Sequence, residues 1–176
     1  PGLPGAVAAD PQRGRLSGTG GTVRSSPWPR RGGLLLGALW ASPWSLLGLL
    51  AGVVGLAAGA SVRISRRERA LVFQHWPWGP GGAMTLGNVI LDTGDGLDRT
   101  CLTYEHRAGR CVHPPVRLGD HERAHVYQYM LLGPLFVPLY FLCGGISVRN
   151  RFERAADHYA MHGHGWWPWT RNRNAS

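Results

Sequence analysis

Residues 34–62 carry no charged side chain and consist mainly of Leu, Ala, Gly and Val. A transmembrane helix needs about 20 consecutive apolar residues, so this segment is long enough to cross a bilayer. Pro43 and the glycines would weaken a soluble helix, but small residues are common where membrane helices pack closely. The sequence therefore predicts one transmembrane helix over 34–62. A signal peptide is the alternative, because Ala58-Gly59-Ala60 imitates a cleavage site, although the apolar region is too long for one.

The net charge of +9 comes entirely from arginine, because the chain contains no lysine. The arginines gather beside the long apolar segment: Arg24, Arg30 and Arg31 precede it, and Arg63, Arg66, Arg67 and Arg69 follow it. Cations at these positions are typical of membrane proteins, where they attract anionic headgroups. We therefore expect the lipid bilayer to be a partner. We expect no nucleic-acid partner, because the sequence contains no recognition-module motif.

Composition divides the chain into four regions. Residues 1–33 are polar and rich in Pro, Gly and Ser, which predicts a flexible segment. The transmembrane segment follows, then residues 63–165 as one small domain, and residues 166–176 as a Trp-rich tail suited to a membrane interface. The sequence begins at Pro1 without an initiator methionine, which is consistent with a fragment or a processed product.

The patterning after the long apolar segment predicts a mainly α fold with a small β-hairpin. Residues 70–73 and 84–91 are strand candidates separated by a turn-rich stretch. A helix is expected from His121, with Asp120 as its N-cap, to about Leu132. A second helix is expected from Asn150 to about residue 160.

A His-Glu-x-x-His motif occupies His121 to His125. On a helix, His121 and His125 lie one above the other, and both can offer ring nitrogens to one Zn²⁺ ion. Glu122 would lie beside the metal, where it can take a proton from a water molecule whose pKa the cation lowers toward about 7. An amphipathic interfacial helix with solvated histidines is the alternative.

A catalytic zinc site also needs a third protein ligand. The downstream candidates are Glu153, Asp157, His158, His162 and His164.

Glu153 and Asp157 stand four residues apart in Asn150-Arg151-Phe152-Glu153-Arg154-Ala155-Ala156-Asp157. Together with the first motif, this pattern resembles the gluzincin peptidases, in particular the membrane peptidases of the prenyl-protease and heat-shock type and their minimal soluble relatives. The resemblance implies that His121, His125 and Glu153 bind zinc, that Glu122 is the general base, and that Asp157 orients a histidine. A capping box, with Glu153 reaching back to the Asn150 backbone, is the structural alternative.

The run His121 to Tyr129 is also similar to small uncharacterised bacterial membrane proteins with a His-Glu-Arg-x-His-Val-x-Gln-Tyr sequence. This second resemblance supplies a family without a known activity, whereas the gluzincin resemblance implies a zinc-dependent peptidase that acts on a peptide or a membrane protein. We expect the protein in the bacterial inner (plasma) membrane. Residues 84–91 would supply the edge strand that pairs with an extended substrate. The alternative function is a non-catalytic integral membrane protein, either a zinc-stabilised scaffold or an accessory subunit of a larger membrane complex.

A second uncharged segment, residues 130–148, decides whether the two motifs can share an ion. If it crossed the bilayer once, His125 and Glu153 would emerge about 30 Å apart on opposite sides. Gly133, Pro134, Pro138, Gly144 and Gly145 interrupt this segment. We therefore expect a helical hairpin or a re-entrant segment that returns Glu153 to the side of His121.

Overall fold

The computed structural model describes residues 31–79, 81–110 and 113–169. Along the chain the described elements are α1 (Arg31–Trp40), α2 (Ser42–Ala57), β1 (Ser61–Ser65), β2 (Ala70–Gln74), β3 (Ala83–Leu86), β4 (Val89–Asp92), β5 (Thr100–Cys101), α3 (Tyr104–Arg107), β6 (Val116–Arg117), α4 (Leu118–Leu132), η1 (Gly133–Leu135), α5 (Phe136–Leu142) and α6 (Arg151–His162). Most of the predicted flexible N-terminal segment and the end of the Trp-rich tail lie outside the described residues.

A four-stranded mixed sheet lies at the centre of the fold, with strand order β1-β2-β4-β3. The pairs β1–β2 and β3–β4 are antiparallel, whereas β2 and β4 run parallel. The prediction that helices combine with a small β component is confirmed, but the prediction of a mainly α fold is wrong, because the β component is a four-stranded sheet. The predicted strand 84–91 is in fact two strands. Gly87, at φ +61°, turns the chain back between β3 and β4, a conformation that glycine adopts at little cost.

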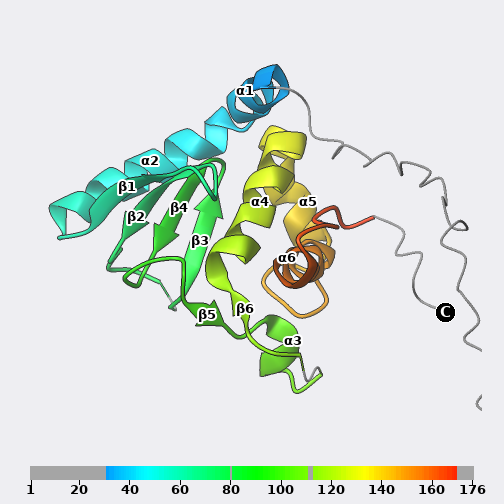
Figure 1. The fold of residues 1–176 in the computed structure, drawn as a ribbon. Helices are drawn as coiled ribbons and strands as arrows, with labels where there is room; N and C mark the ends of the chain where they lie inside the picture. The colour runs from blue at the N-terminus through cyan, green and yellow to red at the C-terminus, as the bar shows by residue number, and fades with distance from the viewer. Residues whose placement is uncertain (1–30, 80, 111–112, 170–176) are drawn as a thin grey trace, which may run out of the picture.

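Both faces of this sheet are covered, which gives three layers: α2, the sheet, and α4 with α6 (Figure 1). Phe73 and Leu91 pack with apolar side chains of α2. Their neighbours Val72 and Ile90 belong to the other cluster, which includes side chains of α4 and α6. Because side chains alternate between faces along a strand, strands covered on both faces are apolar throughout.

The long apolar segment 34–62 is not one straight helix. It forms α1 and α2, which bend by 69° at their junction, and its last residues enter β1. Pro43 lies in the first turn of α2, where its missing N–H is tolerated, but it disfavours continuation of α1. Among the described residues, no single helix is long and apolar enough to span a membrane. The bent pair α1–α2 meets that requirement by length and composition only.

α2 packs on the sheet through buried glycines that share one face of the helix: Gly48, Gly52 and Gly55. A Cβ atom at Gly52 would overlap the ring of Phe73, so only glycine permits this close approach. The opposite side of α2 is apolar and exposed, with Leu50 at 66% and Val54 at 58% exposure. α2 is therefore a helix with one face on protein and one apolar face uncovered.

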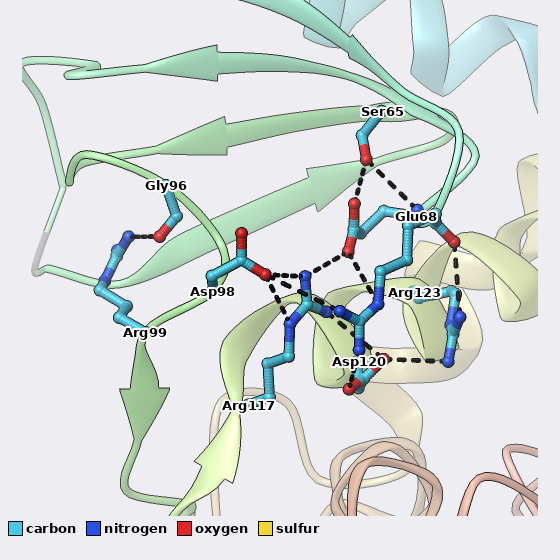
Figure 2. Close-up of polar contacts among 9 residues, drawn as sticks. Ser65, Glu68, Gly96, Asp98, Arg99, Arg117, Asp120 and Arg123 are labelled. Carbon is cyan, nitrogen blue, oxygen red and sulfur yellow. Dashed lines mark hydrogen bonds and ion pairs between the residues drawn. The ribbon is translucent and has the colours of Figure 1, made fainter.

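Ion pairs join the start of α4 to the turn between β1 and β2, as Figure 2 shows. Glu68 is buried in that turn and accepts hydrogen bonds from Ser65 and from Arg117 Nη2, the latter at 2.8 Å. Burial raises the pKa of Glu68, but the hydrogen bonds from Ser65 and Arg117 outweigh it and lower the pKa below its ordinary value. Asp120 pairs with Arg123 at 2.9 Å. These contacts fix the position of the helix that carries the first motif.

α4 begins at Leu118, earlier than the predicted start at His121, and Arg117 is its N-cap. Asp120 therefore lies inside the first turn, where its negative charge favours the helix N-terminus, and it is not the N-cap that the sequence suggested. The earlier start places both motif histidines within regular helix.

The second apolar segment, 130–148, changes direction instead of running straight. α4 ends at Leu132, and Gly133, at φ +54°, is its C-cap. η1 and α5 follow, and a turn then leads into α6. A side chain at Gly133 would overlap Trp40 of α1, so this bend also packs closely against the N-terminal helix. As a result, α6 comes to lie beside α4 (Figure 1).

Candidate metal centre

Three buried side chains of α4 and α6 meet at one point. The Nε2 atoms of His121 and His125 are 3.1 Å apart. Glu153 places its Oε2 atom 3.2 Å from His121 Nε2 and 3.5 Å from His125 Nε2. Among the described residues, this is the group of His, Cys, Asp or Glu side chains whose ligand atoms all lie within 4.8 Å of one another, and it could hold a metal ion.

The size and chemistry of this triangle fit a tetrahedral cation. Zinc binds histidine nitrogens and carboxylate oxygens at about 2.0–2.2 Å, so two such ligand atoms are about 3.3–3.6 Å apart. The distances between the ligand atoms of His121, His125 and Glu153 are 3.1, 3.2 and 3.5 Å, of which one lies within this range and two are slightly shorter. Two imidazoles and one carboxylate are also a known ligand set of catalytic zinc sites, in which a fourth position stays open.

Hydrogen bonds on the far side of each ring orient both histidines. His121 Nδ1 lies 2.9 Å from Asp157 Oδ1, one helical turn after Glu153 on α6. His125 Nδ1 lies 2.8 Å from Gln128 Oε1. Each Nδ1–H donates to an oxygen, which leaves Nε2 with its lone pair directed toward the shared point.

Gln128 has its orientation fixed by two further contacts. Its Nε2 donates to the backbone oxygen of Phe152 at 3.2 Å and to that of Trp166 at 2.9 Å. Because two carbonyls occupy the amide nitrogen, the amide oxygen must face His125. The side chain is fully buried, so this arrangement has no competition from bulk water.

The electrostatics of the site favour a positive charge. Burial lowers the pKa of His121, but the hydrogen bond to Asp157 and the contact with Glu153 outweigh it and raise the pKa well above its ordinary value. Burial likewise lowers the pKa of His125, and the charge of Glu153 raises it above the ordinary value. The pKa of Glu153 moves the opposite way: burial raises it, while the two histidines hold it well below the usual range.

Glu122 is buried on α4 beside the histidines, and its charge contributes to raising the pKa of both. The hydroxyl of Thr85 donates to Glu122 Oε2 at 2.7 Å. Thr85 belongs to β3, which is the edge strand of the sheet next to α4 (Figure 1). Glu122, the predicted general base, is therefore close to the metal-binding histidines and is also hydrogen-bonded to β3, part of the segment predicted to pair with a substrate.

Glu153 does not form the capping box that was its structural alternative. Asn150 caps α6 by accepting a hydrogen bond from the Phe152 backbone N–H at 2.9 Å. The Glu153 carboxylate is directed to the histidines through Oε2, and its Oε1 accepts a hydrogen bond from the hydroxyl of Tyr140 on α5. Both carboxylate oxygens are therefore used away from the helix start.

The other candidates for the third metal ligand do not join His121 and His125. His158, His162 and His164 gather at the C-terminal end of α6 and are not part of the group formed by His121, His125 and Glu153. Asp157 contacts only the far nitrogen of His121, which is the orienting position implied by the resemblance.

Three residues at the site carried no role in the sequence analysis: Thr85, Gln128 and Tyr140. Gln128 could have been found, because it stands three residues after His125 on the same helix and such residues are neighbours. Thr85 and Tyr140 reach the site only through tertiary folding, and no local pattern marks them. The prediction of a separate Trp-rich tail from residue 166 does not account for Trp166, whose carbonyl accepts a hydrogen bond from Gln128.

Comparisons of this chain with protein-family models, with curated proteins and with solved structures found no match.

Proposed function

We propose that this protein is a membrane-associated zinc peptidase whose metal is held by His121, His125 and Glu153. The observation that carries the proposal is the buried triangle of ligand atoms, oriented from outside by Asp157 and Gln128. A zinc ion at this point would supply a Lewis acid that lowers the pKa of a water molecule and polarises a peptide carbonyl. The gluzincin resemblance assigns the same residues to these roles.

The proposal assigns the role of general base to Glu122, which is buried on α4 directly after His121 in the sequence. In the proposed reaction its carboxylate takes a proton from the attacking water and delivers it to the leaving amide nitrogen as the C–N bond breaks. The hydrogen bond from Thr85 engages Oε2 and leaves Oε1 to carry the proton. An extended peptide added to the outer edge of β3 would lie alongside Thr85, which brings the bond to be cleaved toward Glu122.

Replacing Glu122 with glutamine is expected to lower the rate of peptide hydrolysis by at least about 100-fold, because general acid–base catalysis contributes about 10²–10⁴-fold. Tightly bound zinc should remain, since Glu122 is not in the metal-binding group. The measurement is cleavage of a peptide library by the zinc-loaded protein, followed by mass spectrometry and by elemental analysis of both proteins.

Glu105→Gln is the matched control for this substitution, because it changes a carboxylate on α3 that pairs with Arg154 and lies outside the site. It should leave cleavage unchanged. If the wild type holds zinc and cleaves no peptide, the protein is the zinc-stabilised scaffold of the alternative hypothesis. If Glu122→Gln cleaves at the wild-type rate, Glu122 is not the general base and the proposed mechanism is wrong.

The proposed attachment to a membrane rests on the uncovered apolar face of the N-terminal helices. Monomeric soluble proteins rarely expose large apolar patches. The exposed side chains of α1 and α2 are Leu35, Leu36, Leu39, Trp40, Leu46, Leu47, Leu50, Val53, Val54 and Leu56. Neither helix contains a charged residue after its first turn. Arg63 and Arg66, just beyond α2, are exposed and would face anionic headgroups.

The double substitution Leu50→Asp/Val54→Asp should release the protein from membranes. Burying one such side chain contributes about 1.5–3 kcal/mol, so losing two and adding two charges should reduce binding at least about tenfold. The measurement is co-flotation with vesicles of phosphatidylcholine and phosphatidylserine. Leu102→Asp changes an exposed leucine beside β5 and should float like the wild type. Equal flotation of the double variant and the wild type would contradict membrane attachment through α2.

A further inference from the structure

The C-terminal end of α6 carries a second group of metal-binding side chains that the proposed function does not use. His158 and His162 stand four residues apart, and their rings stack with centroids 4.3 Å apart. The ring of His164 lies 5.5 Å from that of His158 and 6.0 Å from that of His162. Three imidazoles therefore occupy one small region of the surface.

The backbone brings His164 back onto the helix. Gly163 ends α6 in the left-handed conformation at φ +75°, and Gly165 follows at φ +80°. A Cβ at Gly165 would overlap the ring of His158, so the chain passes close over that ring only because Gly165 has no side chain. The sequence His-Gly-His-Gly thus builds a reversal that sets the third imidazole beside the first two.

Hydrogen bonds leave ring nitrogens of this group free to bind. His158 Nδ1 donates to the backbone oxygen of His164, and His162 Nδ1 donates to that of His158, each at 3.0 Å. In the neutral ring the other nitrogen, Nε2, then carries a lone pair.

We propose that His158, His162 and His164 form a second, solvent-facing site for a borderline divalent ion such as Zn²⁺ or Cu²⁺, separate from the buried centre. Imidazole ligands suit these ions, whereas Mg²⁺ and Ca²⁺ prefer oxygen ligands. The ligand atoms here are less tightly gathered than at the buried centre, so binding requires rotation of His162 and His164, both of which are exposed. The second site is therefore the weaker of the two.

Occupancy of this site would act on the segment that follows α6. His164 lies two residues before Trp166, whose carbonyl accepts a hydrogen bond from Gln128. An ion shared between α6 and His164 would hold this segment against the helix. The second ion would thereby stabilise the contact that orients His125 through Gln128.

The test is a calorimetric titration of the metal-free protein, purified without a polyhistidine tag, with Zn²⁺. The wild type should bind one ion tightly and one weakly. His162→Ala/His164→Ala should lose the weakly bound ion and keep the tightly bound one. His121→Ala/His125→Ala should lose the tightly bound ion and keep the weakly bound one. His75→Ala is the control: it removes an exposed histidine just after β2 that belongs to neither group, and it should change the binding of neither ion.

These variants separate the two proposals. A wild type that binds one ion, lost in His162→Ala/His164→Ala, would support the second site and refute the buried centre. A protein that binds the same number of ions with and without His162 and His164 would overturn the second site. Electron paramagnetic resonance of Cu²⁺ added to His121→Ala/His125→Ala gives an independent readout: hyperfine coupling to imidazole nitrogens is expected, and its absence would also overturn the proposal.

Discussion

Replacing Glu153 with alanine is expected to abolish tight zinc binding. The buried group offers only three ligand atoms, and Glu153 supplies the one negative charge among them. Substitution of a residue that merely orients a ligand already costs about 10–100-fold in metal affinity, so loss of a ligand should exceed about 100-fold. Zinc measured by elemental analysis after gel filtration should fall from one tightly held ion per chain to none.

Two further variants make this result specific to the metal. Glu153→Gln keeps the shape of the side chain and the hydrogen bond from Tyr140, yet an amide is a poor zinc ligand, so it should also lose the ion while remaining folded. Glu105→Ala removes a partly exposed carboxylate that pairs with Arg154 on the same helix as Glu153, and it should retain zinc. A fully loaded Glu153→Ala protein would show that α6 does not contribute to the centre.

Substituting leucine for Gly52 should strongly destabilise the protein. The first added carbon already overlaps the ring of Phe73, which is buried against the sheet. Overpacking of a core costs about 1–3 kcal/mol and sometimes more, which is a large share of the roughly 5–15 kcal/mol that stabilises a typical domain. Denaturant unfolding followed by circular dichroism in detergent micelles should show the lower midpoint.

Gly32→Leu is the matched control, because Gly32 is exposed in α1 and a Cβ there meets no atom within 4 Å. It should shift the free energy of unfolding by no more than about 0.5 kcal/mol. Comparing Gly52→Leu with Gly32→Leu also tests whether α2 packs on the sheet. If α2 were surrounded by lipid and detached from the sheet, Gly52→Leu would behave like Gly32→Leu.

The sequence predicted the local parts of the candidate site and missed the long-range ones. The spacing of His121 and His125 on a helix follows from helical geometry alone, and α4 has that geometry. Glu153 could be paired with them only through a resemblance to other proteins, because nothing local says that two helices will meet. Thr85 and Tyr140 could not be predicted, since each reaches the site through a separate element.

The fold was harder to predict because an apolar composition is compatible with two different environments. A helix in lipid and a helix packed on a sheet both read as long uncharged segments. The glycines at 48, 52 and 55 carried the missing information, because their spacing puts them on one face of a helix. Small residues at this spacing are typical of close packing between membrane helices, but here Gly52 lets α2 approach Phe73 of the sheet. The exposed apolar side chains on the opposite face of α2 remain the basis for the proposed membrane attachment.

The contact between Gln128 and the carbonyl of Trp166 determines where this chain can be shortened. A boundary at residue 165, where composition changes, would remove an acceptor from a buried amide that orients His125. The amide nitrogen would lose one of its two hydrogen-bond acceptors, and a buried donor without a partner costs about 1–3 kcal/mol. A shortened protein for biochemical work should therefore extend at least through Trp169, which packs on Phe152 of α6.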